Sequence, residues 1–308
     1  MKNFKKALPL TSGMFNQIDF NMKRLLILIF YIAAPILVIG QINQITYNDA
    51  QNYHPKWSLD KNFILYTSMD TSNQPALKLF DIKKDSIIDI NTGKKGDHYA
   101  NWIAGTKRIL FDCEDESGKP SIWEFNLENM QTKKIIGDQI CFHPCPLHDG
   151  RKIAYTSFKT GNPDIFVLDL NTNKIEQLTF NQDTDHHPIW LIDGKKIIFE
   201  SDSAGNFDIY ECDIIEKKIK PLIVTPEFDG HVCLSPDERY LAYSHGPAGM
   251  RNIVIKNLHN GREYFITKEY DNSWPDWSSD NKIVFVSNRE GNMNLYMIDI
   301  SDLLKEIE

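Results

Sequence analysis

Short segments of alternating apolar and polar residues, separated by turn residues, recur along most of the chain. The clearest example is the stretch 187–213, in which β-branched and aromatic residues predict two strands after an extended His-Pro-Ile-Trp segment. Asp193-Gly194 and Gly205 predict the two turns, since glycine tolerates positive φ. His187 itself is expected to be extended, because the proline after it disfavours a helical conformation. The stretch is therefore predicted to fold as strand, turn, strand, turn, strand.

This unit occurs six times, about every 44 residues, as alignment of the copies on Pro188 shows. The aligned positions are Pro55, Ala100, Pro144, Pro188, Val232 and Pro275. In each copy an apolar strand, a hairpin turn and a third strand ending in Asp or Asn follow, and in the first five copies a fourth strand closes the unit. Four short strands in such a unit are typical of a propeller blade. The sequence therefore predicts an all-β, six-bladed β-propeller of four-stranded blades, with Trp and aliphatic residues packed on the neighbouring blade. The second strands are expected at 63–67, 108–112, 152–156, 196–200, 240–244 and 282–286.

The sixth copy has only three strands, and the missing one is expected at the other end of the chain. Residues 44–48 (Gln-Ile-Thr-Tyr-Asn) match residues 177–181 (Gln-Leu-Thr-Phe-Asn), which close an internal blade. The N-terminal segment is therefore predicted to supply the outer strand of the last blade and close the ring, covering an open sheet edge. On this interpretation the propeller covers residues 41–300, and the tail 301–308 forms a helical turn outside the ring.

Residues 1–40 differ from the rest of the chain and predict a leader. Lys23-Arg24 precedes an apolar run of about 16 residues, whereas a membrane-spanning helix needs about 20. A basic segment before a short apolar run is typical of a secretory signal peptide. We expect translation to start at Met22, cleavage near Gly40, and export to the periplasm or cell envelope. An uncleaved membrane anchor is the alternative.

Charge and cysteine content narrow the function classes. The formal net charge is −8 and no basic stripe is present, which disfavours nucleic acid as a partner because such binding depends on phosphate neutralisation. The five cysteines form no C-x-x-C pair and are expected to be small buried residues. After signal cleavage we expect no membrane span, no cofactor and a monomer.

The candidate site comes from the repeat itself. The residue before each aligned position is aromatic in every copy: His54, Tyr99, His143, His187, His231 and Trp274. Three acids stand two residues earlier, and a second histidine lies beside His187: Asp97, Asp185, Asp229 and His186. Equivalent positions of the blades converge on the central channel, so these side chains are expected to line one mouth of it.

Three interpretations of this set stay open. The residues can be structural, packing the loops between blades, since a repeated residue usually has a repeated local role. They can form a binding mouth for a peptide, a partner segment or a small polar ligand. They can also bind a transition metal, because histidine and carboxylate are its usual ligands. A six-bladed channel is expected to be too wide for several of them to reach one ion, so we assign no metal ligand and no catalytic residue.

Three copies share a motif at the end of the first strand: Pro55-Lys-Trp57-Ser58-Leu-Asp60, Leu234-Ser-Pro-Asp237 and Pro275-Asp-Trp277-Ser278-Ser-Asp280. With this motif the repeats resemble, over residues 43–300, the WD-like propeller repeats of the TolB family. The resemblance implies an envelope protein that binds partner proteins at the mouth of its propeller. The chain departs from TolB in that the predicted leader runs straight into the closing strand, without the additional α/β domain.

The same repeats are also similar to the propellers of two enzyme groups. In prolyl-oligopeptidase-type peptidases a hydrolase domain carries a G-x-S-x-G motif, which this sequence lacks. Oligogalacturonate lyase has a seven-bladed ring with a metal-binding histidine cluster, whereas six blades are predicted here. We therefore expect an exported, non-enzymatic scaffold that binds a protein or peptide partner in the cell envelope. The alternative is a lyase or hydrolase acting on a saccharide or peptide, with a mouth histidine as general base beside an acid such as Asp185.

Overall fold

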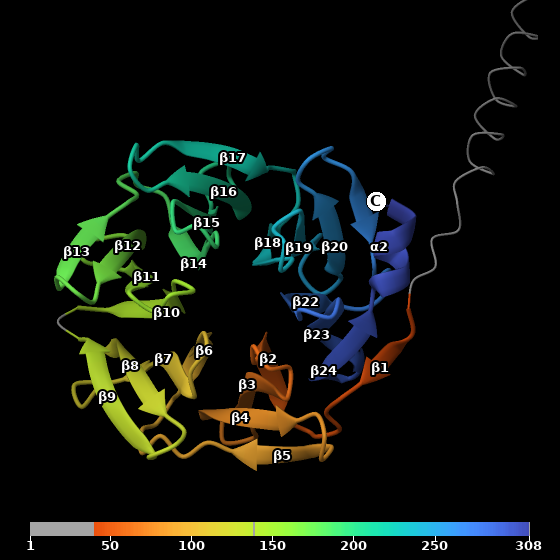
Figure 1. Ribbon diagram of the computed structural model, residues 1–308, viewed down its shortest axis with the longest axis horizontal. Helices are drawn as coiled ribbons and strands as arrows, with labels where there is room; N and C mark the ends of the chain where they lie inside the picture. The colour runs from red at the N-terminus through yellow and green to blue at the C-terminus, as the bar shows by residue number, and fades with distance from the viewer. Residues whose placement is uncertain (1–39, 138, 308) are drawn as a thin grey trace, which may run out of the picture. The chain divides into compact units, whose positions relative to one another are not determined.

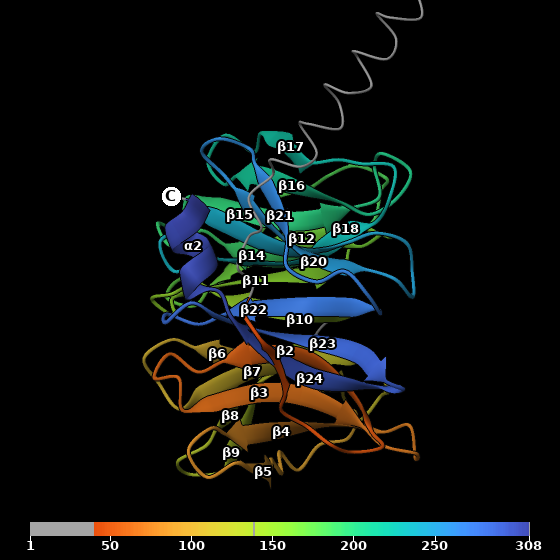
Figure 2. The ribbon, with the colours of Figure 1, turned by 90° about the vertical axis from the view of Figure 1, so that its right-hand side faces the viewer.

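The computed structural model describes residues 40–137 and 139–307. Within these residues six four-stranded antiparallel sheets are arranged around a centre (Figure 1). A view at right angles shows the strands running across the thickness of this ring (Figure 2). The predicted six-bladed all-β propeller is thus confirmed. The predicted leader, with the start at Met22, lies outside the described residues except for Gly40.

Each blade contributes one strand to each of four concentric positions. The innermost strands are β2 (Gln51–Trp57), β6 (His98–Ile103), β10 (Cys141–Pro146), β14 (Asp185–Trp190), β18 (Asp229–Leu234) and β22 (Asn272–Trp277). The second strands are β3 (Phe63–Met69), β7 (Arg108–Glu114), β11 (Lys152–Ser157), β15 (Lys196–Ser201), β19 (Tyr240–His245) and β23 (Lys282–Glu290). The third strands are β4 (Pro75–Asp81), β8 (Pro120–Asn126), β12 (Asp164–Asp169), β16 (Asp208–Asp213), β20 (Asn252–Asn257) and β24 (Asn292–Asp299). The outer strands are β5 (Ser86–Asp89), β9 (Gln131–Ile136), β13 (Lys174–Gln177), β17 (Ile219–Ile223), β21 (Glu263–Phe265) and β1 (Ile42–Gln44).

The second strands form the core of the blades. Every second strand begins at the residue that the sequence predicts, and each carries one almost fully buried aromatic residue at the same register position: Tyr66, Phe111, Tyr155, Phe199, Tyr243 and Phe285. Burying one such side chain stabilises the fold by about 1.5 to 3 kcal/mol, so this layer is a large share of the apolar contribution.

The inner-strand tryptophans join neighbouring blades, as predicted. Trp190 packs in one cluster with Leu147 and Ala154 of the third blade. Its indole Nε1 also donates a 3.0 Å hydrogen bond to the carbonyl of Cys145. Trp102 makes the equivalent bond, 3.2 Å, to the carbonyl of Lys56 in the first blade. Each indole therefore contributes both apolar contact and one polar contact across a blade interface.

The N-terminal strand closes the ring, as the sequence predicts. β1 pairs antiparallel with β24, and the two lie side by side in both ribbon views (Figures 1 and 2). The hydroxyl of Thr46 donates to Oδ1 of Asn294 at 2.9 Å and accepts the N–H of Leu295 at 2.9 Å. Thr179 makes the same two contacts inside the chain, with Asp164 and Ile165. The closing segment is therefore a true equivalent of an internal blade connection.

The tail is helical, as expected, over α2 (Ser301–Ile307). Leu303 and Leu304 of this helix are buried, so it packs on the propeller instead of extending into solvent. No helix in the described part of the chain is both long and apolar enough to cross a membrane. Of the five cysteines, four are buried, Cys145 is partly buried, and none is in a disulfide.

Candidate functional site

Six aromatic side chains, one from each innermost strand, meet at the centre of the propeller. Going round the ring, the distances between neighbouring ring centroids are 3.8, 4.0, 3.8, 6.1, 3.5 and 3.9 Å. We call this set the aromatic ring; its members are His54, Tyr99, His143, His187, His231 and Trp274. Because the side chains touch, the aromatic ring forms a narrow constriction of the channel and does not simply border an open mouth.

All members of the aromatic ring have a left-handed backbone, with φ between 43° and 57°. Each lies at a β-bulge, where two residues of the innermost strand face one residue of the second strand; in β14 the shift falls between His186 and Ile189. The expectation that His187 is extended is therefore wrong. The bulge overrides the preference that the following proline imposes, and it directs the extra side chain toward the channel. A left-handed residue other than glycine costs about 1 to 2 kcal/mol, which the ring contacts must offset.

Polar side chains of the second strands hold this backbone in place. Oδ1 of Asp112 accepts the N–H of His143 at 3.0 Å. Oε1 of Glu200 accepts the N–H of His231 at 2.6 Å. In both cases the acceptor belongs to one blade and the donor to the next, so the bonds fix the bulge across the blade interface.

Burial shifts the protonation of the site toward uncharged forms. Burial lowers the pKa of His187 to about 3 and that of His186 to about 4. The pKa values of His54, His143 and His231 also lie well below the ordinary value, mainly because of burial. Burial raises the pKa of Asp112 and of Glu200 to about 7. The imidazoles are therefore neutral at pH 7, and the two carboxyl groups are poised near half-ionisation.

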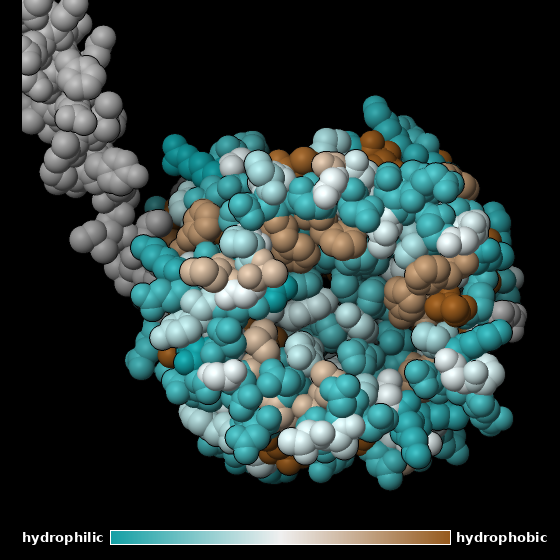
Figure 3. Space-filling view, turned by 180° about the vertical axis from the view of Figure 1, so that it is seen from behind, coloured by the Kyte–Doolittle hydropathy of each residue, from teal (hydrophilic) through white to brown (hydrophobic). Residues whose placement is uncertain are grey.

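Two connected cavities lie along the channel on one side of the aromatic ring. The first, of about 60 Å³, is bounded by the aromatic ring, Lys56, Asn101 and Glu200. The second, of about 330 Å³, shares Lys56 and Asn101 with it and is lined by Trp57, Trp102 and Trp190. Together they make a funnel that leads from the surface to the aromatic ring. The space-filling view in Figure 3 shows the centre of the propeller hollowed on the face drawn.

The three acids of the predicted mouth lie elsewhere. Asp97, Asp185 and Asp229 are almost fully buried at the start of the innermost strands and do not line either cavity of the funnel. Oδ2 of Asp97 accepts the hydroxyl of Thr92 at 2.6 Å. Asp97 thus binds the segment that connects the first and second blades, which is a structural role.

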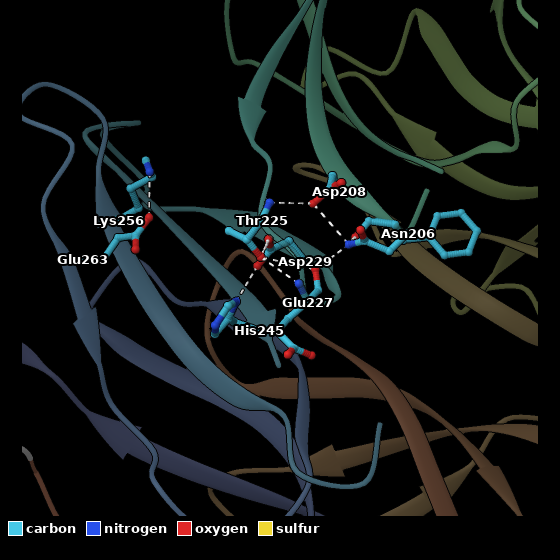
Figure 4. Close-up of polar contacts among 9 residues, drawn as sticks. Asn206, Asp208, Thr225, Glu227, Asp229, His245, Lys256 and Glu263 are labelled. Atoms are coloured by element: carbon cyan, nitrogen blue, oxygen red, sulfur yellow. Dashed lines mark hydrogen bonds and ion pairs between the residues drawn. The ribbon is translucent and has the colours of Figure 1, made fainter. Parts of the chain in front are cut away.

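Asp229 illustrates this role most clearly (Figure 4). Its Oδ2 accepts the hydroxyl of Thr225 at 2.8 Å, and its Oδ1 lies 2.7 Å from Nδ1 of His245. The backbone N–H of Thr225 in turn donates to Oδ1 of Asp208 at 3.0 Å. The network ties the connection between the fourth and fifth blades to strands of both.

His186 does lie beside the aromatic ring, with its Nδ1 2.5 Å from Nδ1 of His187 and its ring 4.4 Å from that of Phe207. The expectation that the channel is too wide for several ligands to approach one another is wrong. Ligand atoms of His143, His186 and His187 all lie within 4.8 Å of one another. The left-handed bulge explains the difference, because it places side chains such as those of His143 and His187 in the channel. An extended strand would leave the channel wider.

Asp112 and Glu200 were missed at the level of sequence. Each is an acid within an otherwise apolar second strand, Arg-Ile-Leu-Phe-Asp-Cys and Lys-Ile-Ile-Phe-Glu-Ser. An acid at a position that strand alternation buries is unusual and marks a group with a specific partner. The sequence thus indicates that Asp112 and Glu200 have specific partners, but it does not identify those partners.

The family of the chain follows from comparison with known proteins. A family model described as the TolB beta propeller domain matches residues 113–306, which is more than half of the chain. The chain belongs to the TolB β-propeller family. The resemblance inferred from the repeat motifs is thereby confirmed. No curated protein sequence matches the chain.

Solved structures agree with the TolB-family fold. TolB from Acinetobacter baumannii superposes with a TM-score of 0.61 at 21% identity, covering 81% of this chain and 63% of that one. A protein from Agrobacterium tumefaciens assigned to TolB gives a TM-score of 0.66 at 13% identity, covering 85% and 98%. Oligogalacturonate lyase from Vibrio parahaemolyticus gives 0.58 at 12% identity, covering 85% and 94%. The chain thus spans less than two thirds of the A. baumannii TolB, and at these identities the likeness concerns the fold alone.

Proposed function

We propose that this TolB-family propeller is an exported, non-enzymatic scaffold that binds a segment of a protein or peptide partner in its channel. The observation that carries the proposal is the funnel, whose larger cavity of about 330 Å³ has tryptophan walls and whose smaller cavity ends at the aromatic ring. Binding sites are typically concave, mostly apolar, and supplied with a few polar groups, and about 300 Å³ is the lower end of their usual volume. The aromatic ring forms the floor of the site, so its members contact the end of the bound segment.

The rim of the funnel favours a polypeptide as the ligand. Leu59 and Ile192 line the larger cavity and are 61% and 57% exposed. Apolar side chains at the rim of a concave site are typical of protein-binding surfaces. Lys56 and Asp276, which form a 3.1 Å ion pair inside the funnel, supply polar groups for a peptide backbone.

Site-specific photo-crosslinking tests the proposal. A photo-crosslinking amino acid at Ile192 is expected to capture a partner in the producing cells, whereas one at Ile215 is not. Ile215 is a matched control because it is 83% exposed and lies outside the funnel. The captured segment, made as a synthetic peptide, should bind the purified protein, and Ile192→Asp should weaken binding at least 10-fold while Ile215→Asp leaves it unchanged. Equal crosslinking from both positions, or a peptide that binds both variants alike, would reject the funnel as the site.

Export rests on the predicted leader and has its own test. Fractionation of cells that produce the full chain should place it in the periplasm or envelope fraction. A matched chain in which a start Met is followed directly by Gln41 should stay in the cytoplasm. Recovery of both forms in the cytoplasm would contradict export without affecting the funnel experiment.

An enzyme is the second candidate, and one observation favours it. Glu200 has a pKa raised to about 7 by burial and lies 3.3 Å from Nδ1 of His187, an arrangement suited to general acid–base catalysis. The structural neighbour from V. parahaemolyticus is a lyase acting on oligogalacturonate. Incubation with uronate oligosaccharides and with peptides should then give turnover that Glu200→Gln abolishes. Absence of turnover with the wild-type protein would leave the scaffold as the function.

A further inference from the structure

The fourth blade brings several ligand-type atoms together beside the aromatic ring. Nδ1 of His186 and Nδ1 of His187 lie 2.5 Å apart. Oε2 of Glu200 lies 3.6 Å from the first and 3.3 Å from the second. His143, from the third blade, offers a further imidazole whose ligand atom is within 4.8 Å of those of His186 and His187.

We propose that His186, His187 and Glu200, together with His143, bind one divalent transition-metal ion such as Zn²⁺. Ligands that are each about 2.0 to 2.2 Å from one ion stand roughly 3 to 3.5 Å apart, and the two carboxylate–imidazole separations are close to that range. The two Nδ1 atoms are closer than this, so the imidazoles turn slightly apart when the ion enters. The site is independent of whether the funnel binds a peptide.

Unpartnered buried atoms support the site. Glu200 is fully buried, and its Oε2 accepts no hydrogen bond from the described residues. Nδ1 of His143 is likewise buried without a hydrogen-bond partner there. A buried acceptor that lacks a donor is costly, whereas a cation satisfies several such atoms at once.

The ligand chemistry selects the class of ion. Imidazole nitrogens suit zinc, nickel and copper, whereas magnesium and calcium need a shell made mostly of oxygen atoms. Only one carboxylate contributes here, so the hard cations should bind poorly. The cavity of about 60 Å³ lined by His143, His187 and Glu200 has room for water, which can complete the coordination.

The second blade provides an internal control. His98 pairs with Asp112 in the same register in which His186 pairs with Glu200. The position of His187 is occupied there by Tyr99, so the second imidazole is missing. The repeat thus presents the same histidine–carboxylate pair twice, and only one copy has the ligands for a metal.

Metal binding by the full chain, prepared without an affinity tag and freed of metal by chelation, tests the proposal. Equilibrium dialysis against Zn²⁺ should show one equivalent bound by the wild-type protein and by His98→Asn. His186→Asn and Glu200→Gln should each weaken binding by about 100-fold or more, because loss of a ligand costs more than the 10- to 100-fold typical of an outer-shell partner. Mg²⁺ and Ca²⁺ should not compete at equal concentration.

A measurement on the wild-type protein keeps the test decisive if a variant fails to fold. X-ray absorption of the zinc-loaded protein should give a shell of nitrogen and oxygen atoms with imidazole scattering from three histidines. Less than half an equivalent of bound Zn²⁺, equal losses in His98→Asn and His186→Asn, or an absorption spectrum without imidazole would each overturn the site. In those cases the contact between His186 and His187 is a hydrogen bond and no more.

Discussion

Oε1 of Glu200 accepts a 2.6 Å hydrogen bond from the backbone N–H of His231, which belongs to the next blade. Asp112 accepts the backbone N–H of His143 in the same way. The hydroxyl oxygen of Ser244 accepts the backbone N–H of Trp274 at 3.2 Å. In each case a second-strand side chain holds a residue of the aromatic ring at the left-handed bulge. The aromatic ring is therefore positioned by polar contacts between blades, and not only by the packing of its own side chains.

Removing the acceptor at Glu200 should destabilise the fold. In Glu200→Ala the N–H of His231 stays buried without a partner and a cavity forms, so we expect a loss of about 2 to 4 kcal/mol in the free energy of unfolding. Glu200→Gln keeps the acceptor and offers a donor to the histidine rings, so it should lose at least about 1 kcal/mol less. Urea unfolding in the presence of a chelator measures both.

The exposed Glu216 is the matched control for this pair. Its changes to Ala and Gln should each stay within about 0.5 kcal/mol of the wild-type protein. Equal losses for Glu200→Ala and Glu200→Gln would show that the hydrogen bond to His231 does not stabilise the fold.

The left-handed backbone makes a second prediction, at His54. This residue has φ 53° and is only 6% exposed. Asn and Val both remove the aromatic side chain, but Asn tolerates positive φ and a β-branched residue does not. His54→Val should therefore be less stable than His54→Asn by about 1 to 2 kcal/mol.

Tyr53 is the natural comparison for His54, since it is the preceding residue of the same strand and pairs with Thr67 in regular register. There the order of Val and Asn should reverse, because β-branched residues favour an extended strand. Thermal or urea unfolding of the Val and Asn variants at both positions measures these differences in stability. The same ranking of Val and Asn at both positions would show that the backbone conformation at His54 is not the cause.

The fold could be predicted from the sequence because its determinants are local and repeated. Alternation, turn glycines and the Asp or Asn at each third-strand end depend on neighbouring residues, so the six copies reinforce one another. Gly205, predicted as a hairpin turn, has φ 105° and closes a 2.9 Å bond to the carbonyl of Asp202. The closing strand was also predictable, because residues 44–48 repeat an internal connection.

The site was less predictable because its geometry depends on a conformation that local rules disfavour. Nothing in His-Pro indicates a left-handed histidine, so the aromatic ring was expected to border an open mouth. Asp97, Asp185 and Asp229 follow the repeat as faithfully as the histidines, yet they do not line the funnel. Glu200 lies in another strand, and its approach to His187 requires the assembled blade. The repeat identified the candidate residues, but it could not show which of their side chains face the channel.

Closure of the ring gives a third prediction. Deleting residues 41–48 removes the pairing of β1 with β24 and the buried residues Ile45 and Thr46. A loss of several kcal/mol is expected, which lowers the Tm by about 10 °C for a domain of this size. A milder change is more specific: Thr46→Val should cost about 1 to 3 kcal/mol by leaving the N–H of Leu295 without its acceptor.

Thr179→Val tests whether the closing strand behaves as an internal connection. Thr179 accepts the N–H of Ile165 at 3.0 Å, as Thr46 accepts that of Leu295. If the ring is one cooperative unit, the two substitutions should lower the Tm by similar amounts. A Tm unaffected by the deletion or by Thr46→Val would contradict closure by the N-terminal strand.

The pH dependence of stability should report on Asp97. Burial raises its pKa from 3.8 to about 6, while the hydroxyl of Thr92 and the charge of Lys94 act in the opposite direction. Because the folded state holds the proton more tightly than the unfolded state, the contribution of Asp97 is most favourable below pH 4. It decreases as the pH rises from about 4 to about 6 and is constant above that, a total loss of at most about 3 kcal/mol.

Asp97→Asn should remove this dependence, so its stability relative to the wild-type protein should increase between pH 4 and pH 6. Asp115→Asn should behave in the opposite way. The hydrogen bond from Ser117 is the largest cause that holds the pKa of Asp115 below its usual value, so that carboxylate stabilises the fold above pH 4 and loses its contribution as the pH falls. Urea unfolding of Asp97→Asn across about pH 4 to 7, and of Asp115→Asn across about pH 2 to 5, measures the two slopes. If Asp97→Asn follows the wild-type curve throughout, the buried carboxyl at the start of β6 does not change its proton occupancy on folding.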